Sequence, residues 1–248
     1  MTTMSEALDN AGGAAMIAGT VLLRPLLAPR YRCWNATDDE IKRILPGDAR
    51  VPAPALTQTL AVTIDASPAV VWPWLAQIGQ ERGGLYSYEL LENIARCQIH
   101  NADRIVPEWE LHVGDRVRLG PPGYPVHQVV GLERSRWLLL AGADIKTGEA
   151  PDPPQSGEAE YTNYSWVFYL HQQPDGATRL ITRNRLDYAP RSFGLRLMWE
   201  WFTDPIGFVM TRKMLLGIKQ RAENQIGAWH FSDDSHTMTS SDQVPGTA

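Results

Sequence analysis

The sequence predicts an α+β fold in which an antiparallel β-sheet packs against one long C-terminal α-helix. Three observations support this prediction. Residues 59–65 alternate between apolar and polar side chains, as a half-buried strand does. Residues 161–171 and 178–187 read as two longer strands, joined by the hairpin turn signal Pro174-Asp175-Gly176. From Pro205 to about Trp229, apolar residues recur every three or four positions, which gives a helix one apolar face.

The remaining elements follow from local signals. The segment Thr37-Asp-Asp-Glu40 is a capping box that begins a short helix. Prolines at 46, 52 and 54 then predict a stiff, extended linker. Ser67 followed by Pro68 begins a helix that Gly79 ends, and a second helix follows at about residues 88–96. Short strands are expected at residues 115–119, 125–132 and 136–141, followed by a loop at 142–159.

These elements divide the chain into three parts. Residues 1–54 are expected to form a helical extension and linker. Residues 55–230 hold the sheet and its covering helix, because an antiparallel sheet cannot bury one face alone. Residues 231–248 are small and polar, and we expect a disordered tail.

Composition narrows the function classes. The formal net charge of −5 argues against a nucleic-acid partner, which needs a basic surface. Cys33 and Cys97 lie far apart without a CxxC pair, which argues against a disulfide framework and favours a reduced, cytoplasmic location. The chain lacks P-loop, GxGxxG and GxSxG motifs, so we expect no nucleotide cofactor and no covalent nucleophile.

The apolar stretch at residues 14–28 permits two interpretations. It is too short to span a bilayer, it is interrupted by Arg24 and Pro25, and no basic residue precedes Arg24 as a secretory signal would require. A short helix packed on the domain is the simpler interpretation. Peripheral contact of residues 14–28 with a membrane is the alternative.

One segment concentrates polar chemistry beside apolar runs. Residues 80–93 and 97–109 carry two tyrosines, a tryptophan, two arginines, a histidine and several carboxylates. A loop that only connects elements does not need this set. We therefore expect the segment to line the mouth of a binding site.

The element order, the Ser67-Pro-x-x-Val-Trp-x-x-Leu75 pattern and the closing helix resemble the START/Bet v 1-like (SRPBCC) superfamily. Within it, the runs Gln80–Asn93 and Ile99–Trp109 look like a bacterial branch described as polyketide cyclase/dehydrase-like. The resemblance covers about residues 34–228 and implies a helix-grip fold around a hydrophobic pocket. Members include lipid carriers, hormone sensors and aromatase/cyclases, so the fold alone does not decide the function.

Candidate site residues follow from these patterns. A ligand between sheet and helix would be hydrophobic or amphipathic, lipid-like or polyketide-like. Its expected contacts are Arg82, Tyr86, Tyr88, Asn93, Arg104, Trp109, Trp166, Asn184, Met210 and Met214. If the protein is a cofactor-free enzyme, His100 and Glu108 are its expected acid and base. No metal is expected, because His100, Asp103, Glu108 and His112 match no known ligand spacing.

Structural alternatives accompany these assignments. The charges of the polar segment could pair with one another and pin a long loop. The Met210 and Met214 face could be plain core. Arg179, Arg183 and Arg185 alternate with Thr182 and Asn184, and the simpler register points the arginines to solvent and the other two toward the ligand. In the reversed register two arginines would line the cavity and require an acidic ligand group or partner carboxylates. Contiguous exposed aromatics at residues 199–202 would favour a third function, docking of a partner or a membrane.

Overall fold

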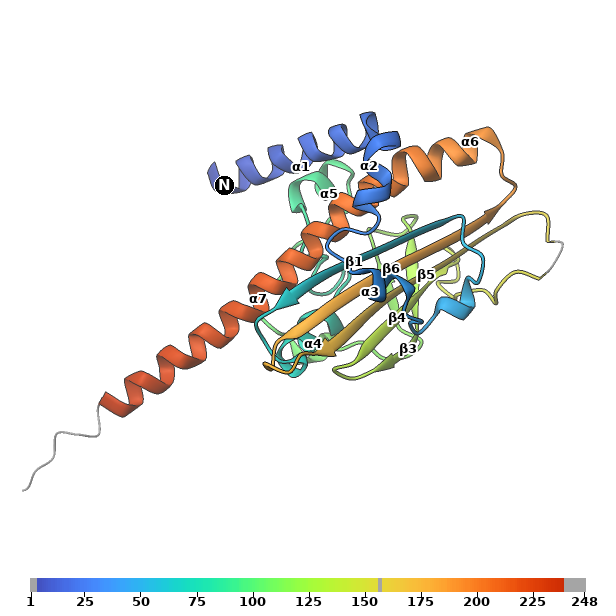
Figure 1. Ribbon diagram of the computed structural model, residues 1–248. Helices are drawn as coiled ribbons and strands as arrows, with labels where there is room; N and C mark the ends of the chain where they lie inside the picture. The colour runs from blue at the N-terminus through green and yellow to red at the C-terminus, as the bar shows by residue number, and fades with distance from the viewer. Residues whose placement is uncertain (1–3, 156–157, 239–248) are drawn as a thin grey trace, which may run out of the picture.

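The chain folds as a six-stranded antiparallel sheet with one long helix across one face (Figure 1). A computed structural model describes residues 4–155 and 158–238, with the side chains of those residues up to 226. The strands are β1 (Leu56–Ile64), β2 (Arg116–Arg118), β3 (Val126–Glu133), β4 (Trp137–Ala143), β5 (Tyr161–Gln172) and β6 (Thr178–Ala189). Their order across the sheet is β1-β6-β5-β4-β3-β2. The predicted α+β helix-grip architecture is confirmed.

The helices flank this sheet. They are α1 (Met4–Leu22), α2 (Arg24–Tyr31), α3 (Asp38–Lys42), α4 (Pro68–Ala76), α5 (Glu89–Ile94), α6 (Phe193–Arg196) and α7 (Asp204–Met238). Short 3-10 turns occur at η1 (Asp48–Arg50) and η2 (Pro107–Trp109), and a π-helical segment, η3 (Leu197–Thr203), joins α6 to α7. Helix α7 includes residues 231–238 of the expected tail, and residues 239–248 lie outside the described residues.

The apolar core lies between α7 and the inner face of the sheet, which is the face that α7 covers. Trp166 and Phe168 lie two positions apart in β5 and so share one side of the strand; they point to this face, and both are buried. Met214 and Ile218 of α7 pack into the same cluster. Side chains therefore fill the interior in this region, as burial of apolar surface favours.

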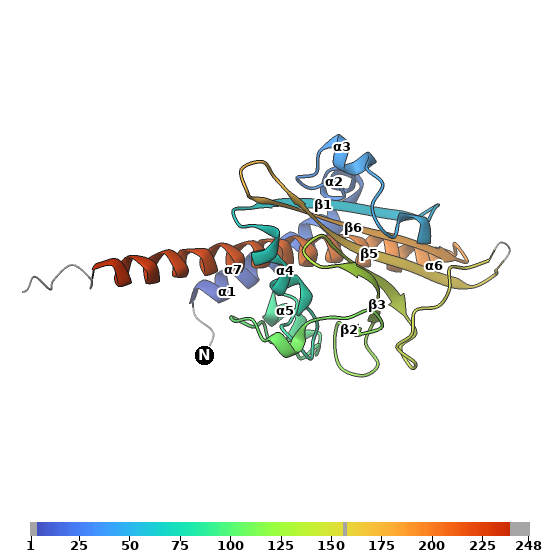
Figure 2. The same cartoon turned by 90° about the horizontal axis from the view of Figure 1, so that it is seen from below.

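The opposite, outer face of the sheet is covered by the N-terminal strap, defined here as residues 32–54. Leu45 of the strap packs on Ala61, Val167 and Ile181 of three neighbouring strands. In Figure 2, α3 of the strap and α7 lie on opposite sides of β1. The sheet is therefore covered on both faces along β1, β6 and β5.

The arginines of β6 were expected to face solvent, and the presence of the strap shows that this expectation was wrong. Arg179, Arg183 and Arg185 do point away from α7, but they do not face solvent. Arg183 is only 3% exposed, and its five N–H groups bind Thr59 Oγ1, Asp48 Oδ2 and three carbonyl oxygens of the strap at 2.6–3.0 Å. Residue spacing alone could not show that another segment lies over this face.

The first two helices pack on the α7 side of the molecule. Gly13 of α1 lies against the ring of Tyr88, and Asp9 pairs with Lys213 of α7 at 2.7 Å. The axes of α1 and α2 differ in direction by 112°. Within the described residues, no individual helix has the length and apolarity to cross a membrane; the bent pair α1–α2 meets that test of length and composition only when the two are joined.

Candidate functional site

The polar segment at residues 80–109 is organised by Asn101. Its Oδ1 accepts hydrogen bonds from the backbone N–H groups of Leu85 and Tyr86 at 3.1 and 2.6 Å. Its Nδ2 donates to the carbonyl oxygen of Ser87 at 3.2 Å. A buried loop must satisfy its backbone groups in this way, so Asn101 holds the loop in shape.

Tyr86 belongs to this loop. Its backbone has a positive φ of 53°, and its side chain is buried. The phenol oxygen accepts a hydrogen bond from Gln77 Nε2 at 2.8 Å, and the Arg221 guanidinium stacks 4.7 Å from the ring centroid. Burial raises the pKa of Tyr86 to about 12, so the ring stays neutral. These contacts occupy both its polar group and its face.

Several other residues that were expected to contact a ligand instead contact main-chain groups of the protein. Asn93 exchanges two hydrogen bonds with the backbone of Ile99, at 2.7 and 2.8 Å. Tyr88 packs on Gly13, and Arg82 donates to the carbonyl oxygen of Trp109 at 2.8 Å. These contacts fix the shape of the segment, and the ion-pair partner of Arg82 is Asp115, outside the segment.

The two predicted catalytic residues are on the surface. The His100 side chain is 87% exposed and pairs with Glu89 at 3.1 Å. Glu108 is exposed in η2, and the side chain of Arg104 is exposed as well. Among the described residues, His100 pairs with Glu89 and not with Glu108.

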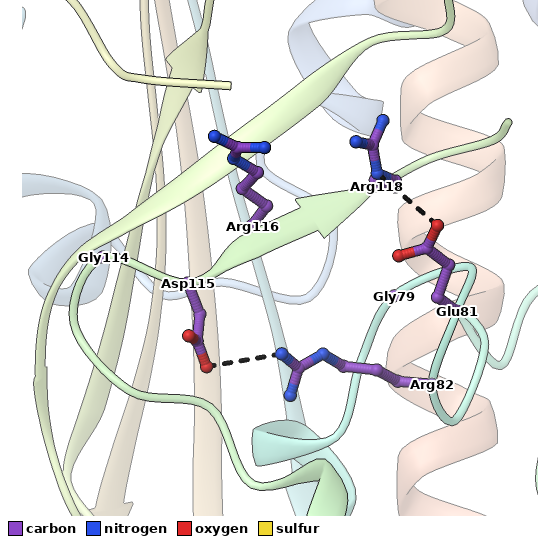
Figure 3. A pocket seen from close by; sticks show the side chains of 7 residues that line it. All are labelled: Gly79, Glu81, Arg82, Gly114, Asp115, Arg116 and Arg118. Carbon is purple, nitrogen blue, oxygen red and sulfur yellow. Dashed lines mark hydrogen bonds and ion pairs between the residues drawn. The ribbon is translucent and has the colours of Figure 1, made fainter. Parts of the chain in front are cut away.

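A polar pocket of about 330 Å³ opens beside this loop (Figure 3). Its lining residues are Gly79, Glu81, Arg82, Gly114, Asp115, Arg116 and Arg118. Arg82 pairs with Asp115 at 3.3 Å and Arg118 with Glu81 at 3.6 Å, as the dashed lines in Figure 3 mark. Arg116 donates to the carbonyl oxygen of Thr147 at 2.5 Å. Each guanidinium thus already has an oxygen partner.

A second pocket, of about 490 Å³, lies at the start of α4 and the ends of β4 and β5. It is lined by Ser67, Pro68, Ala69, Ser135, Arg136, Tyr169, Leu170, His171 and Gln172. Neither pocket lies between α7 and the inner face of the sheet.

One polar cluster of the inner face is formed by His127, Tyr164, Trp166 and Asn184. The His127 ring of β3 lies tilted, 5.1 Å from the ring of Tyr164, and edge-on, 5.9 Å from that of Trp166, measured between centroids. The Tyr164 hydroxyl donates to Asn184 Oδ1 at 2.7 Å. Trp166 Nε1 donates to Thr182 at 2.8 Å. We call these four residues the inner-face cluster.

His127 is the unusual member. It is only 7% exposed, and its Nδ1 is buried with no hydrogen-bond partner in the described part of the chain. Such a group is costly unless something satisfies it. Burial lowers the pKa of His127 to about 4, so the imidazole is neutral at pH 7 and offers one donor and one acceptor. Burial also raises the pKa of Tyr164.

Access to the cluster differs from access to the rest of the core. Tyr164 and Asn184 are each half-buried, whereas Phe168 of the same face is fully buried. Two of the four cluster residues are thus partly accessible to solvent.

Sequence reasoning identified Trp166 and Asn184 but missed His127 and Tyr164. A signal was present, since His127 lies in the strand expected at residues 125–132 and Tyr164 lies two residues before Trp166. The sequence does not show that His127 is buried, because its burial depends on contacts with Tyr164 and Trp166 of a strand about forty residues later.

One carboxyl group is also buried without a full set of partners. Glu92 of α5 is buried, and its Oε2 has no hydrogen-bond partner among the described residues. Burial, with a smaller contribution from the charge of Glu89, raises the pKa of Glu92 to about 7.

In residues 4–155 and 158–226, no group of three or more His, Cys, Asp or Glu side chains is placed to hold a metal ion.

Comparison with known proteins adds little about the site. No protein-family model matches the chain, and no curated protein matches it. Solved structures with some likeness include CalU16 from Micromonospora echinospora (15% identity, 70% of this chain and 88% of that one, TM-score 0.29). Others are DynU16, from the dynemicin biosynthetic locus (17%, 63% and 46%, TM-score 0.32), and a conserved protein from Geobacillus kaustophilus (12%, 68% and 96%, TM-score 0.36). Likeness this weak assigns neither fold nor function to the chain.

Proposed function

We propose that the protein binds an amphipathic small molecule between α7 and the inner face of the sheet, with the polar group of the ligand at His127. The observation that carries this proposal is the buried, unpartnered Nδ1 of His127, surrounded by aromatic rings. Binding sites of this class combine an apolar lining with a few convergent polar groups. The inner-face cluster has that composition.

The chemistry of the cluster favours a neutral polar group on the ligand. The arginines of β6 point to the outer face, where strap oxygens satisfy them, so no arginine of that strand faces the cluster. An anionic ligand group buried beside His127 would have no charged partner from this strand. A carbonyl or hydroxyl group, in contrast, can hydrogen-bond to a neutral imidazole and to Asn184.

The helix supplies an adaptable wall. Met210 is half-buried on α7 and belongs with Met214 to the residues expected to contact a ligand. Methionine side chains adjust to irregular apolar shapes more readily than branched ones. In this proposal Trp166, Asn184, Met210 and Met214 keep their expected role. Arg82, Tyr86, Tyr88 and Asn93 support the loop beside it.

The first test is ligand binding by matched variants. Native mass spectrometry of gently purified protein, followed by titration with the neutral probe N-phenyl-1-naphthylamine, would show whether the wild type holds an organic molecule. His127→Phe keeps an aromatic ring but removes both ring nitrogens. We expect it to weaken binding of a native adduct roughly threefold to tenfold, as loss of one hydrogen bond does.

His112→Phe is the control, because its side chain is 78% exposed. Equal affinity in His127→Phe and wild type, or probe binding that a Met210→Trp variant leaves unchanged, would contradict the proposed site. All three variants should retain the circular dichroism of the wild type.

A cofactor-free cyclase or dehydrase is the second candidate. The observation that favours it is the buried, unpartnered Nδ1 of His127, which a bound polyketide-like substrate could contact directly. The exposed His100 and Glu108 would act as acid and base only if substrate reached the surface near them. A rate that is abolished in His127→Phe and unchanged in His100→Ala and Glu108→Gln would assign the chemistry to the inner-face cluster.

A further inference from the structure

Two exposed apolar segments from distant parts of the chain lie on the same side of the molecule. One is the corner between α1 and α2, and the other is α6 with η3; Figure 1 shows α1, α2 and α6 together along one edge. The exposed apolar residues are Leu22, Leu23 and Leu26 at the corner, and Phe193, Leu197, Met198, Trp201 and Phe202 in the second segment. We call these eight residues the apolar ridge.

Arg24 joins the two segments. Its Nη2 pairs with Glu200 Oε2 at 3.4 Å, and its guanidinium lies 5.3 Å from the centroid of the Trp201 ring. Next to this contact, the buried Asp204 at the start of α7 accepts hydrogen bonds from Tyr31 and Arg32 of the α2 end, at 2.7 and 2.8 Å. The apolar ridge is therefore held as one surface rather than as two loose ends.

The exposure of the ridge is not explained by packing within the chain. Neither α6 nor η3 contains a buried residue, although both are rich in large apolar side chains. Phe193 is 82% exposed and Leu26 is 71% exposed. A contiguous apolar surface of this kind on a folded protein marks a site of contact with something else.

Charge around the ridge identifies the chemistry of the partner. Residues 10–37 contain Arg24, Arg30 and Arg32 but no Asp or Glu, in a chain whose formal net charge is −5. Arg30 is exposed, lies one helical turn after Leu26, and makes no ion pair with another described residue. Arg191 precedes the second segment and pairs with Asp187, and Arg196 lies within the segment. Arg24 and Arg196 share the single carboxylate of Glu200, so arginines outnumber carboxylates along this border. A locally basic border complements a negatively charged surface.

We propose that the apolar ridge docks the protein on the surface of a bilayer that contains anionic lipids. Leucine, phenylalanine and tryptophan side chains would enter the interface between headgroups and acyl chains, and the arginines would contact lipid phosphates. The 112° bend makes the leucines a corner rather than a groove. A shape of this kind suits a lipid surface better than a partner helix, which needs a groove to enter. Neither helix crosses the bilayer in this arrangement.

The test is co-sedimentation with vesicles of phosphatidylcholine, with and without phosphatidylglycerol. We expect the full chain to bind the mixed vesicles, and to bind pure phosphatidylcholine more weakly. Leu26→Glu and Phe193→Glu, one from each segment, should each lower the partition coefficient about tenfold or more, since each removes an apolar side chain that would enter the lipid and adds a negative charge.

Ile44→Glu is the matched control. Ile44 is 89% exposed, but it lies in the strap on the other face of the sheet, and its substitution should leave binding unchanged. Equal binding by all four proteins, or no binding by the wild type, would overturn the proposal. So would a concentration-dependent dimer that only the two ridge variants abolish, because a second copy would then be the occupant. The ridge variants leave His127 untouched, so this test and the test of ligand binding succeed or fail independently.

Discussion

Buried polar side chains show most directly how this chain uses its charges. Arg183 is satisfied at all five N–H groups, and the oxygen atoms that it contacts belong mainly to the strap. Glu92, in contrast, is buried with one oxygen unpartnered. The contacts of Arg183 stabilise the docked strap. The buried carboxyl of Glu92 makes the stability of the folded state depend on pH.

Arg183→Lys should destabilise the protein although the charge is kept. A lysine has three donors on a flexible stem and cannot replace the planar, five-donor guanidinium. Because carbonyl oxygens of Glu40, Ile41 and Arg43 would lose their donors, we expect the free energy of unfolding in urea to fall by about 2 kcal/mol or more. Arg134→Lys, at an exposed ion pair with Glu110, should change it by less than about 0.5 kcal/mol. Equal effects would refute the role of the strap contacts.

Glu92 should make stability fall as the pH rises. Its pKa is near 4.5 when unfolded and about 7 when folded, so between these values the folded state binds more protons. The stability that the protonated carboxyl contributes is therefore complete below about pH 4.5 and is lost as the pH rises to about 7. The loss is roughly 2–4 kcal/mol. Urea unfolding across this range should show a flatter profile for Glu92→Gln than for wild type, whereas the exposed Glu108→Gln should follow wild type.

At the scale of elements, α7 serves as the surface on which the polar loop rests. The contact depends on Gly217, because a Cβ at that position would lie 2.3 Å from the carbonyl oxygen of Tyr86. Tyr86 itself has a positive φ, so its backbone has little freedom to move away. Helix α7 and the backbone of the polar loop therefore approach each other closely at Gly217.

Gly217→Ala should therefore be destabilising, against the usual helix preference for alanine. We expect a loss of about 1–3 kcal/mol in the free energy of unfolding, as overpacking gives. Gly207→Ala in the same helix has no atom within 4 Å of the new Cβ, and it should gain about 0.5–1 kcal/mol from helix propensity. Chemical denaturation of the two variants measures both signs. A gain in both would show that the loop is not held against α7.

At the scale of the whole molecule, the two N-terminal segments have different attachments. The strap is clamped to the sheet by buried ion pairs, among them Arg179 with Glu40 and Arg183 with Asp48. Helix α1 is mostly exposed and is held by Gly13 against Tyr88 and by Asp9 with Lys213. Exposed elements with few buried contacts open more readily than core strands.

Hydrogen exchange should display this difference. We expect weak protection for amides of α1 and strong protection for β5 and β6. Gly13→Ala would place a Cβ 2.7 Å from the Tyr88 ring and should speed exchange in α1 by roughly fivefold to thirtyfold, the effect of 1–2 kcal/mol. In Gly12→Ala the new Cβ meets nothing within 4 Å, so α1 should exchange no faster than in wild type. Equal rates in the two variants would place the attachment of α1 elsewhere.

The parts predicted well from sequence are those set by local periodicity. Alternation along β5 assigned Trp166 and Phe168 to the inner face, and the spacing in α7 assigned Met214 and Ile218 to its apolar side. The same alternation gave β6 its correct faces. It did not show that Arg183 is buried, because the covering strap lies about 140 residues earlier in the chain.

The features of the candidate site can likewise be separated into those set by local sequence and those set by tertiary contacts. The sequence by itself determined the α+β architecture, the facing of the strands and the concentration of polar residues at 80–109, since propensity, turns and hydrophobic period act between near neighbours. Only the tertiary structure decided that Asn101 and Gln77 hold this segment in place, that His127 is buried beside Tyr164, and that the α1–α2 corner meets η3. Each of these depends on desolvation and hydrogen bonding between groups that become neighbours only when the chain has folded.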